Sequence, residues 1–465
     1  MSIYIMAGFL FAVATRSFAA WADANSLAVG LSQNQYLGEK QAPEQKSQYT
    51  FLSADLVFVP QTTNVDFKLD ILADGALNAQ NEFYFGVPEA FVHPKGLADD
   101  FDITVGRQKR HWSHLDEEFN LGVWQPQLRW DYLRPEQEGL LGVFIDVQLT
   151  SRLKLTLLSS PVFLPDQGPN YQLKQGTFSS ANRWFVPPQS RLSLFQGTPY
   201  AKDAPLSFEL DRPTDEKFIM HSTIGGALSL AGEGPWWANL AYAFKPRNQI
   251  HLGIECTNCF NISGPTPGEI TAVVHPVTVM HNVATFETGY KSHDDDAWIS
   301  LTYDKPSASD LPANYEESPL DTMVIYGGGY QHFLDFSQLP RSWVKLSYMQ
   351  VVTVEKTDRQ GLVDSDQVQS SLDRYPYEKL AAFEWRVLLH NQPKSRVEFD
   401  ARYSYSFPEQ GGWLEAGLVY AQNSFTYSLG LDILGSSVDP TSADAGLFTR
   451  YRTNDRVYAG VGYVF

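Results

Sequence analysis

Cysteine and long apolar runs are scarce in this sequence, and basic residues are fewer than acidic ones. Two cysteines among 465 residues exclude a disulfide-dense scaffold. Apolar residues make up 43% of the chain, yet no stretch approaches the ~20 apolar residues that a membrane-spanning helix needs. With 53 acidic against 35 basic residues the net charge is −18, which argues against a nucleic-acid partner. A helical membrane protein and a nucleic-acid-binding protein are therefore not expected.

The longest apolar run lies at the start of the chain, in residues 3–14. It is too short to span a bilayer but has the length of a signal-peptide core. The small residues that signal peptidase requires follow in Ser17-Phe18-Ala19 and Ala20-Trp21-Ala22, and the polar Asp23 favours cleavage at the second. We predict a signal peptide in residues 1–22 and a single mature domain in residues 23–465.

From residue 25 onward, short segments alternate apolar with polar residues. In the clearest one, Phe399, Ala401, Tyr403, Tyr405 and Phe407 alternate with Asp400, Arg402, Ser404 and Ser406. This pattern is typical of transmembrane strands, whose side chains face lipid and lumen in turn, but a soluble β-sandwich also alternates. The number of segments and the aromatic residues near their ends, among them Trp237, Trp298 and Trp343, favour the membrane, where such residues form interfacial girdles.

Short turns and long connections also alternate. Residues 391–395 and 422–424 are tight turns, whereas 355–375 and 435–454 are long and polar. Outer-membrane barrels have short periplasmic turns and long extracellular loops. We therefore predict an all-β, up-and-down antiparallel transmembrane barrel of about 18 to 20 strands, with 16 as an open alternative, integral to an outer membrane and surrounded by its lipid.

The last segment of the chain carries the most specific motif. One of its faces is wholly apolar and comprises Val457, Ala459, Val461, Tyr463 and Phe465. A terminal Phe with apolar residues at alternate positions resembles the signal that the barrel-assembly machinery of Gram-negative bacteria recognises. The resemblance implies that this machinery is a partner of the chain.

A second resemblance covers about twenty residues. Glu89-Ala90-Phe91-Val92 leads through a turn to Ile103-Thr104-Val105-Gly106-Arg107-Gln108. This hairpin is similar to one that is frequent in substrate-selective porins and alginate-export-type barrels. The resemblance implies a porin-like barrel and assigns no solute.

Charged residues within the alternating segments are expected to face the lumen, because a charge on the lipid face would cost ~2–4 kcal/mol at mid-membrane. The predicted lumen-lining residues are Asp66, Lys68, Asp70, Asp102, Asp146, Lys154, Glu384, Arg386, Asp400 and Arg402.

Residues 107–136 concentrate charges of both signs in one connection. The candidates are Arg107, Lys109, Arg110, His111, His114, Asp116, Glu117, Glu118, Arg129 and Arg134. Folded inward, they would form a constriction with a transverse field that selects polar solutes. The alternative is a solvent-exposed loop whose charges keep it soluble.

Two further features lie in other connections. Residues 160–217 are rich in proline and aromatic residues, which predicts a compact extracellular lid or partial plug rather than a flexible tether. Cys256 and Cys259 are three positions apart, and in an oxidising envelope a small disulfide is expected. No second Cys or His pair lies nearby to complete a zinc site, so no metal site is predicted there.

The predicted function is passive diffusion of small polar solutes or short saccharides through a porin-like channel. One alternative is a barrel with a plugged lumen and an adhesive or structural role, and another is a lipid-modifying enzyme. Neither G-x-S-x-G nor H-E-x-x-H occurs, so no catalytic residues, metal or cofactor are expected. The oligomeric state is left open.

Overall fold

The computed structural model describes residues 25–60, 62–97, 100–188, 191–194, 202–231, 234–257, 270–308, 311, 315–317, 320–336, 339–356, 374–392, 394–440, 442 and 444–465. The predicted signal peptide lies outside these residues. Within them, no helix has the length and hydropathy to cross a bilayer.

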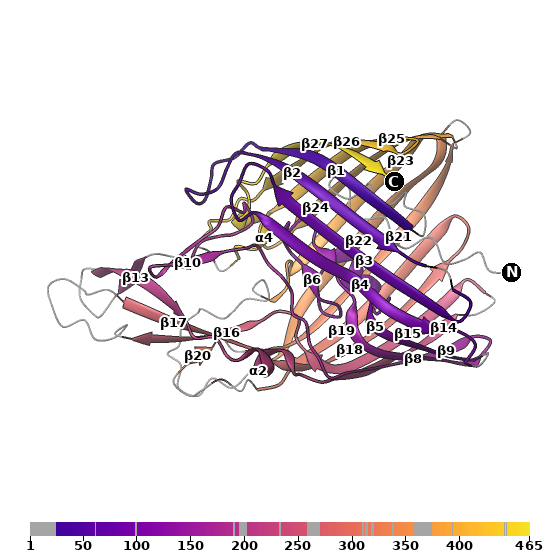
Figure 1. The fold of residues 1–465 in the computed structure, drawn as a ribbon, viewed down its shortest axis with the longest axis horizontal. Helices are drawn as coiled ribbons and strands as arrows, with labels where there is room; N and C mark the ends of the chain where they lie inside the picture. Colours follow the sequence, from indigo (N-terminus) through magenta and orange to yellow (C-terminus); the bar gives the residue numbers. More distant parts are fainter. Residues whose placement is uncertain are drawn as a thin grey trace.

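Eighteen strands form one closed sheet (Figure 1). They are β1 (Asn25–Tyr36), β2 (Gln48–Phe58), β3 (Val65–Ala76), β4 (Phe83–Pro94), β5 (Phe101–Gln108), β8 (Leu140–Thr150), β9 (Leu153–Ser160), β14 (Thr223–Ala231), β15 (Trp236–Pro246), β18 (Met280–Lys291), β19 (Asp295–Pro306), β21 (Thr322–Phe336), β22 (Leu339–Glu355), β23 (Lys379–Gln392), β24 (Ser395–Ser406), β25 (Gly411–Gln422), β26 (Phe425–Gly435) and β27 (Arg456–Val464).

Each of these strands pairs antiparallel with the next, and β27 returns to β1. Ala28 lies opposite Val464 and Tyr36 opposite Arg456, so the sheet has no free edge. The prediction of an up-and-down antiparallel barrel is confirmed, and the strand number is eighteen.

The outer face of the barrel is apolar and its inner face is polar. On neighbouring strands β15, β18 and β19, Leu240, Phe286 and Ile299 are 53%, 49% and 63% exposed. The alternate positions Glu287 and Ser300 are buried inside. A closed barrel with this outer surface is an integral protein of the outer-membrane type, because its backbone hydrogen bonds are satisfied within the sheet while hydrocarbon covers its apolar side chains.

The predicted faces of β24 are confirmed. Tyr403 and Phe407 are exposed on the outside, while Asp400, Ser404 and Ser406 are buried inside. The girdle assignment is wrong for three tryptophans. Trp298 is buried, the ring of His114 lies 4.5 Å from Trp237, and the Arg386 guanidinium lies over Trp343.

The tryptophan error has a simple cause. Trp237 lies two residues from the buried Asn239, and Trp298 two residues from the buried Ser300. Side chains two positions apart share a face of a strand, so both indoles face the lumen. Closeness to the end of a strand does not decide which face a residue occupies.

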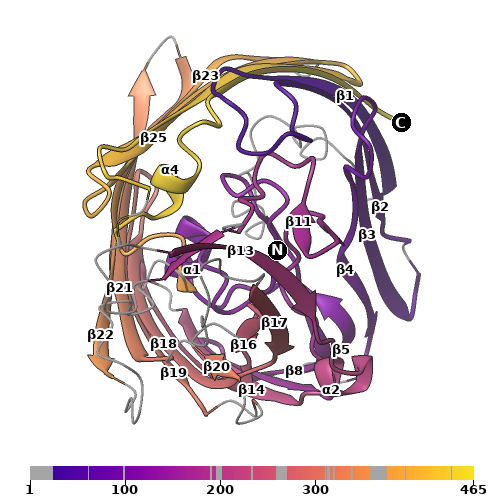
Figure 2. The ribbon, with the colours of Figure 1, turned by 90° about the vertical axis from the view of Figure 1, so that its left-hand side faces the viewer.

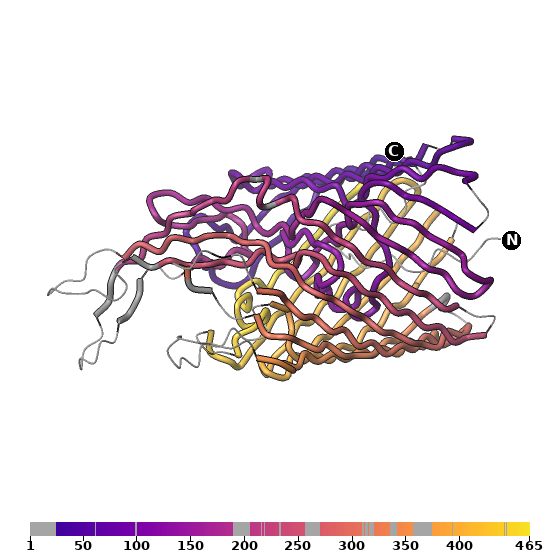
Figure 3. Tube along the Cα trace, turned by 90° about the horizontal axis from the view of Figure 1, so that it is seen from below, coloured from indigo at the N-terminus to yellow at the C-terminus, as the bar shows by residue number. Residues whose placement is uncertain are grey.

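Short turns lie at the end of the barrel where β1 begins and β27 ends, and most long connections lie at the other end, here called the mouth (Figure 3). The predicted alternation of turns and loops is confirmed, although β24 and β25 are joined at the mouth by residues 407–410 alone.

A five-stranded sheet projects beyond the mouth, at the left of Figure 1. It contains β12 (Arg191–Leu194), β13 (Lys202–Leu210), β16 (His251–Thr257), β17 (Ile270–Val277) and β20 (Glu316–Glu317), with β13 and β17 parallel. Cys256 lies on β16, whereas Cys259 is outside the described residues, so the disulfide stays a prediction.

The segment predicted as a lid, residues 160–217, divides between two locations. Its first part packs inside the mouth, where Trp184 is buried and the Arg183 guanidinium donates to the carbonyl oxygen of Thr453 at 2.6 Å. The hairpin of β10 (Gln172–Lys174) and β11 (Thr177–Ser179) lies beside β13 of the projecting sheet (Figure 1), where the Phe208 N–H donates to the Gly176 carbonyl oxygen at 2.8 Å. The later part of the segment supplies β12 and β13 to the projecting sheet and ends with α2 (Asp215–Ile219).

A charge on the outer face should destabilise the barrel. We expect Leu240→Arg, in the middle of β15, to lower the free energy of unfolding by ~2–4 kcal/mol, because the guanidinium must enter hydrocarbon. Equilibrium unfolding from lipid vesicles measures this change. Leu240→Ala adds no charge and should cost clearly less, and equal losses for the two variants would contradict the lipid-facing assignment.

Candidate functional site: charged side chains around an inward segment

The connection between β5 and β8 runs inside the barrel (Figure 2). We call residues 109–139 the inward segment. Arg110 binds Asp146 of β8 at 2.8 Å, Trp124 Nε1 donates to Thr285 of β18 at 2.8 Å, and Arg134 binds Asp432 of β26 at 2.6 Å. These strands lie on different sides of the closed sheet, so the segment crosses the lumen.

At Gly106, just before the inward segment, β5 approaches β4 closely. Gly106 has φ +127°, and a Cβ there would lie 2.2 Å from the Ala90 carbonyl oxygen. Only glycine avoids this clash. Next to it the alternation of β5 is interrupted, because Arg107 is buried although it lies an odd number of positions from the buried Thr104. The Arg107 guanidinium then binds Glu138 at 2.8 Å, which holds the two ends of the inward segment together.

The segment has its own local order. Helix α1 (His114–Phe119) begins after Ser113, whose Oγ accepts the Asp116 N–H at 3.2 Å, and ends at Asn120 in the left-handed conformation. The Asp116 carboxylate accepts the N–H groups of Val123 and Trp124 at 2.9 and 3.0 Å. Burial raises the pKa of Asp116 to about 6, although these two donors oppose the shift. Asp116 therefore organises the turn after α1.

Apolar side chains of the segment fill much of the barrel interior. Trp112 and Trp124 stack with ring centroids 5.2 Å apart, and Leu115 and Phe119 are buried beside them. They join a cluster that also includes Phe448 of α4 (Leu447–Arg450), in the connection between β26 and β27. Burial of this apolar surface stabilises the inward position of the segment.

Glu118 anchors the end of α1 to the wall. Its carboxylate forms an ion pair with Lys345 of β22, accepts a hydrogen bond from Ser347 at 3.1 Å and lies 3.4 Å from Arg402 of β24. Burial alone would raise the pKa of Glu118, but the two cations outweigh it and lower this pKa.

Arg134 forms a second anchor, on the neighbouring strands β25 and β26. Its guanidinium binds Glu415 of β25 and Asp432 of β26, both at 2.6 Å, between the rings of Trp413 and Tyr458. Arg456 also binds Asp432, at 2.6 Å. The two carboxylates overcome burial and raise the pKa of Arg134 well above its usual value.

Two other basic candidates, Lys109 and Arg129, pair with acidic residues of the connections between strands. Lys109 binds Glu136 at 2.7 Å, next to the β6 (Gln127–Leu128) and β7 (Glu136–Gln137) hairpin, and Arg129 binds Asp166 at 3.1 Å. Burial opposes the charge of Lys109, but Glu136 and Asp70 hold its pKa above the usual value.

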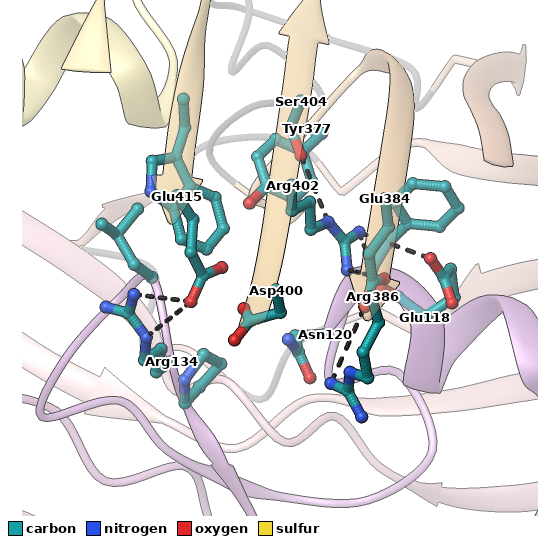
Figure 4. A pocket seen from close by; sticks show the side chains of 14 residues that line it. Glu118, Asn120, Arg134, Tyr377, Glu384, Arg386, Asp400, Arg402, Ser404 and Glu415 are labelled. Carbon is teal, nitrogen blue, oxygen red and sulfur yellow. Dashed lines mark hydrogen bonds and ion pairs between the residues drawn. The ribbon is translucent and has the colours of Figure 1, made fainter. Parts of the chain in front are cut away.

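A cavity of about 60 Å³ lies between the inward segment and strands β23 to β25 (Figure 4). Its charged lining comprises Glu118, Arg134, Glu384, Arg386, Asp400, Arg402 and Glu415. In Figure 4, Asp400 lies between the Arg134 and Glu415 pair and the group around Arg402. Asp400 Oδ1 is buried and has no hydrogen-bond partner among the described residues. The structure thus gathers six sequence-predicted residues around one cavity.

The remaining predicted wall residues lie on the other half of the barrel. Lys68 pairs with Glu89. Asp146 accepts hydrogen bonds from Arg110 and Thr156, and it forms an ion pair with Lys154 at 3.4 Å. Asp66 and Asp102 lie near the short-turn end, next to Lys95 at 2.6 Å and His93 at 3.6 Å. These residues line the wall but do not reach the cavity.

Several residues of the site were not among the sequence candidates. They are Glu287, Lys345, Glu415, Asp432 and Arg456, all on barrel strands and all buried. Asp432 lies between Leu431 and Ile433, so the alternation used for β24 would have found it. His111 and His114 meet Glu287 at a separate point, where His114 Nδ1 is 3.1 Å from Glu287 Oε2, and Glu117 pairs with His111 at 2.9 Å.

No protein-family model and no curated protein sequence matches this chain. Similar solved structures include OccK2 (OpdF) of Pseudomonas aeruginosa, with 10% identity over 95% of this chain and 97% of that one and a TM-score of 0.48. OccAB3 of Acinetobacter baumannii has 10% identity over 95% and 98%, with a TM-score of 0.45. Wzi of Escherichia coli, described as a carbohydrate-binding β-barrel involved in capsule assembly, has 10% identity over 95% and 85%, with a TM-score of 0.41.

Removing Arg134 should destabilise the barrel strongly. Arg134→Met leaves Glu415 and Asp432 buried with less compensation, and we expect a loss of ~3–5 kcal/mol in the free energy of unfolding. Lys291→Met is the control, because Lys291 pairs with Asp296 at an exposed position and its loss should cost below ~1 kcal/mol. Equal losses in vesicle unfolding would show that Arg134 is not an anchor.

The buried carboxyl group of Glu82, at the mouth, predicts that the stability of the fold depends on pH. Glu82 lies in the turn between β3 and β4, where Asn182 Nδ2 donates to Glu82 Oε1 at 2.6 Å, and burial raises the pKa of Glu82 to about 7. Between an ordinary pKa of 4.5 and 7, the folded chain keeps a proton that the unfolded chain has lost, so rising pH destabilises the fold across this window.

Comparison of wild type with Glu82→Gln isolates this contribution. We expect the stability of the wild type relative to the variant to fall between pH 5 and pH 8, with the loss complete above pH 7. Denaturant unfolding at both pH values measures it, and parallel pH profiles of the two proteins would contradict the raised pKa.

Proposed function

We propose that this porin-like outer-membrane barrel is a channel of low conductance for small polar solutes or short saccharides. Passage would follow the charged wall between the inward segment and strands β23 to β25. The observation that supports this proposal best is the cavity at that wall, where guanidinium and carboxylate groups face one another inside a closed barrel. We propose passive transport without catalysis.

The lining favours polar solutes for an electrostatic reason. Arg134, Arg386 and Arg402 alternate with acidic groups, and separated charges of both signs produce a field across the path. Such a field aligns dipolar molecules and replaces part of their hydration. A cavity of about 60 Å³ holds only a few waters, so solutes would pass when lining side chains move.

A second candidate is a barrel with a closed lumen and a structural or adhesive role. The apolar cluster around Trp112, Trp124 and Phe448 favours it, because this cluster fills lumen that a wide pore would leave to water. The projecting sheet would then be the surface that meets a partner.

We also propose that the barrel-assembly machinery recognises β27. Val457 and Val461 are exposed on the outer face, and Phe465 at the chain end is 71% exposed. This apolar edge lies at the seam with β1, where pairing with another strand is sterically simple before closure.

Single-channel recording distinguishes the two candidates. We expect small discrete conductance steps from the refolded wild type. Asp400→Asn should shift the reversal potential towards anion selectivity, because a carboxylate of the cavity is lost while side-chain volume is kept. Asp294→Asn, in an exposed short turn, is the matched control and should leave the potential unchanged. A folded wild type without conductance steps would favour the closed barrel.

A further inference from the structure

Three metal-ligating atoms meet at one point of the barrel interior. His111 Nε2 lies 2.9 Å from His114 Nδ1, His114 Nδ1 lies 3.1 Å from Glu287 Oε2, and His111 Nε2 lies 3.8 Å from Glu287 Oε2. The histidines belong to the inward segment and Glu287 belongs to β18.

The size of this triangle suits a transition-metal ion. Zinc binds imidazole nitrogen at ~2.0–2.1 Å and carboxylate oxygen at ~2.0–2.2 Å, so tetrahedral ligand atoms lie roughly 3.3–3.5 Å apart. The three distances, 2.9, 3.1 and 3.8 Å, fall on both sides of that spacing. Shifts of a few tenths of an ångström would bring all three atoms to one ion.

Hydrogen bonds alone satisfy the three atoms poorly. His114 Nδ1 is close to both His111 Nε2 and Glu287 Oε2, and one ring nitrogen carries either a single proton or a lone pair. With a proton it must share one N–H between two acceptors. With a lone pair it faces a carboxylate oxygen at 3.1 Å. A cation would accept a lone pair from each of the three atoms.

The surroundings hold the three side chains in place. His111 Nδ1 lies 2.9 Å from Glu117 Oε2, and Ser113 Oγ donates to Glu287 Oε1 at 2.8 Å. The His114 ring stacks on Trp237, with centroids 4.5 Å apart. Outer partners of this kind orient metal ligands and increase their basicity.

The three side chains differ in their exposure. The Glu287 side chain is fully buried, whereas that of His111 is 43% exposed. An ion would therefore have three protein ligands and a free position towards the exposed side, where water would complete a tetrahedron.

We propose that His111, His114 and Glu287 bind one divalent transition-metal ion of the zinc class, which fastens the inward segment to β18. Two imidazoles and a carboxylate suit such an ion better than magnesium or calcium, which prefer oxygen ligands. This site goes beyond the proposed function, because it holds whether or not the lumen conducts. It also revises the expectation, drawn from the sequence, that the chain has no metal site.

Zinc titration of the whole refolded chain tests the proposal. After treatment with a chelator, calorimetry of the barrel in detergent should show one Zn²⁺ bound per chain, and binding should raise the midpoint of thermal unfolding. We expect His111→Ala and His114→Gln to lower the affinity at least ~10-fold. Cobalt gives a second readout, as a tetrahedral Co²⁺ absorption band that the wild type shows and both variants lose.

His332→Gln is the matched control, because His332 lies 2.9 Å from Asp295 at the short-turn end and should leave zinc affinity unchanged. Circular dichroism confirms that each variant folds. The proposal is overturned if the folded wild type binds no stoichiometric zinc, or if both site variants retain wild-type affinity. Neither result bears on conductance, so failure here is separate from failure of the channel.

Discussion

Hydrocarbon offers no hydrogen-bond partner to a peptide group, and this constraint shapes the whole molecule. Each strand must be paired along both edges, which requires that β27 meets β1. Once the sheet is closed, alternate side chains are divided between two environments. Leu240 and Phe286 enter the lipid, and Glu287 enters the interior.

The charged side chains that point inward then need partners of opposite charge, because the inward segment separates them from bulk water. The structure pairs charges of the wall with charges of the inward segment. Glu118 meets Lys345 and Arg402, and Arg134 meets Glu415 and Asp432. Such pairs are costly to break, since a lone buried charge lacks compensation, and they give the segment a defined position. The apolar cluster around Trp112 and Trp124 adds a non-directional attraction between the same two surfaces.

Much of the fold could be predicted from the sequence, because the period of two in segments such as 399–407 reports directly on the two faces of a strand. The charges of residues 107–136 likewise marked the segment that lies inside. The partners of those charges could not be predicted, since Arg134 and Asp432 are 298 positions apart and meet only through the strand order and tilt of the closed barrel. The same holds for Glu287 beside His114. Trp298 was misplaced because an indole suits a membrane interface and a barrel interior equally well.

The position of Arg134 has a consequence for biogenesis. Its partners lie on β25 and β26, and Arg456 on β27 completes the network, so Arg134 is secured only when these three strands are in the barrel. Arg110, by contrast, finds Asp146 only 36 positions further along the chain. The part around Arg110 therefore needs only the neighbouring strand β8, whereas the part around Arg134 needs β25 to β27. Fixation of the inward segment and closure of the barrel are therefore coupled. A barrel that lacks β25 to β27 would leave the part of the segment around Arg134 without its ion pairs.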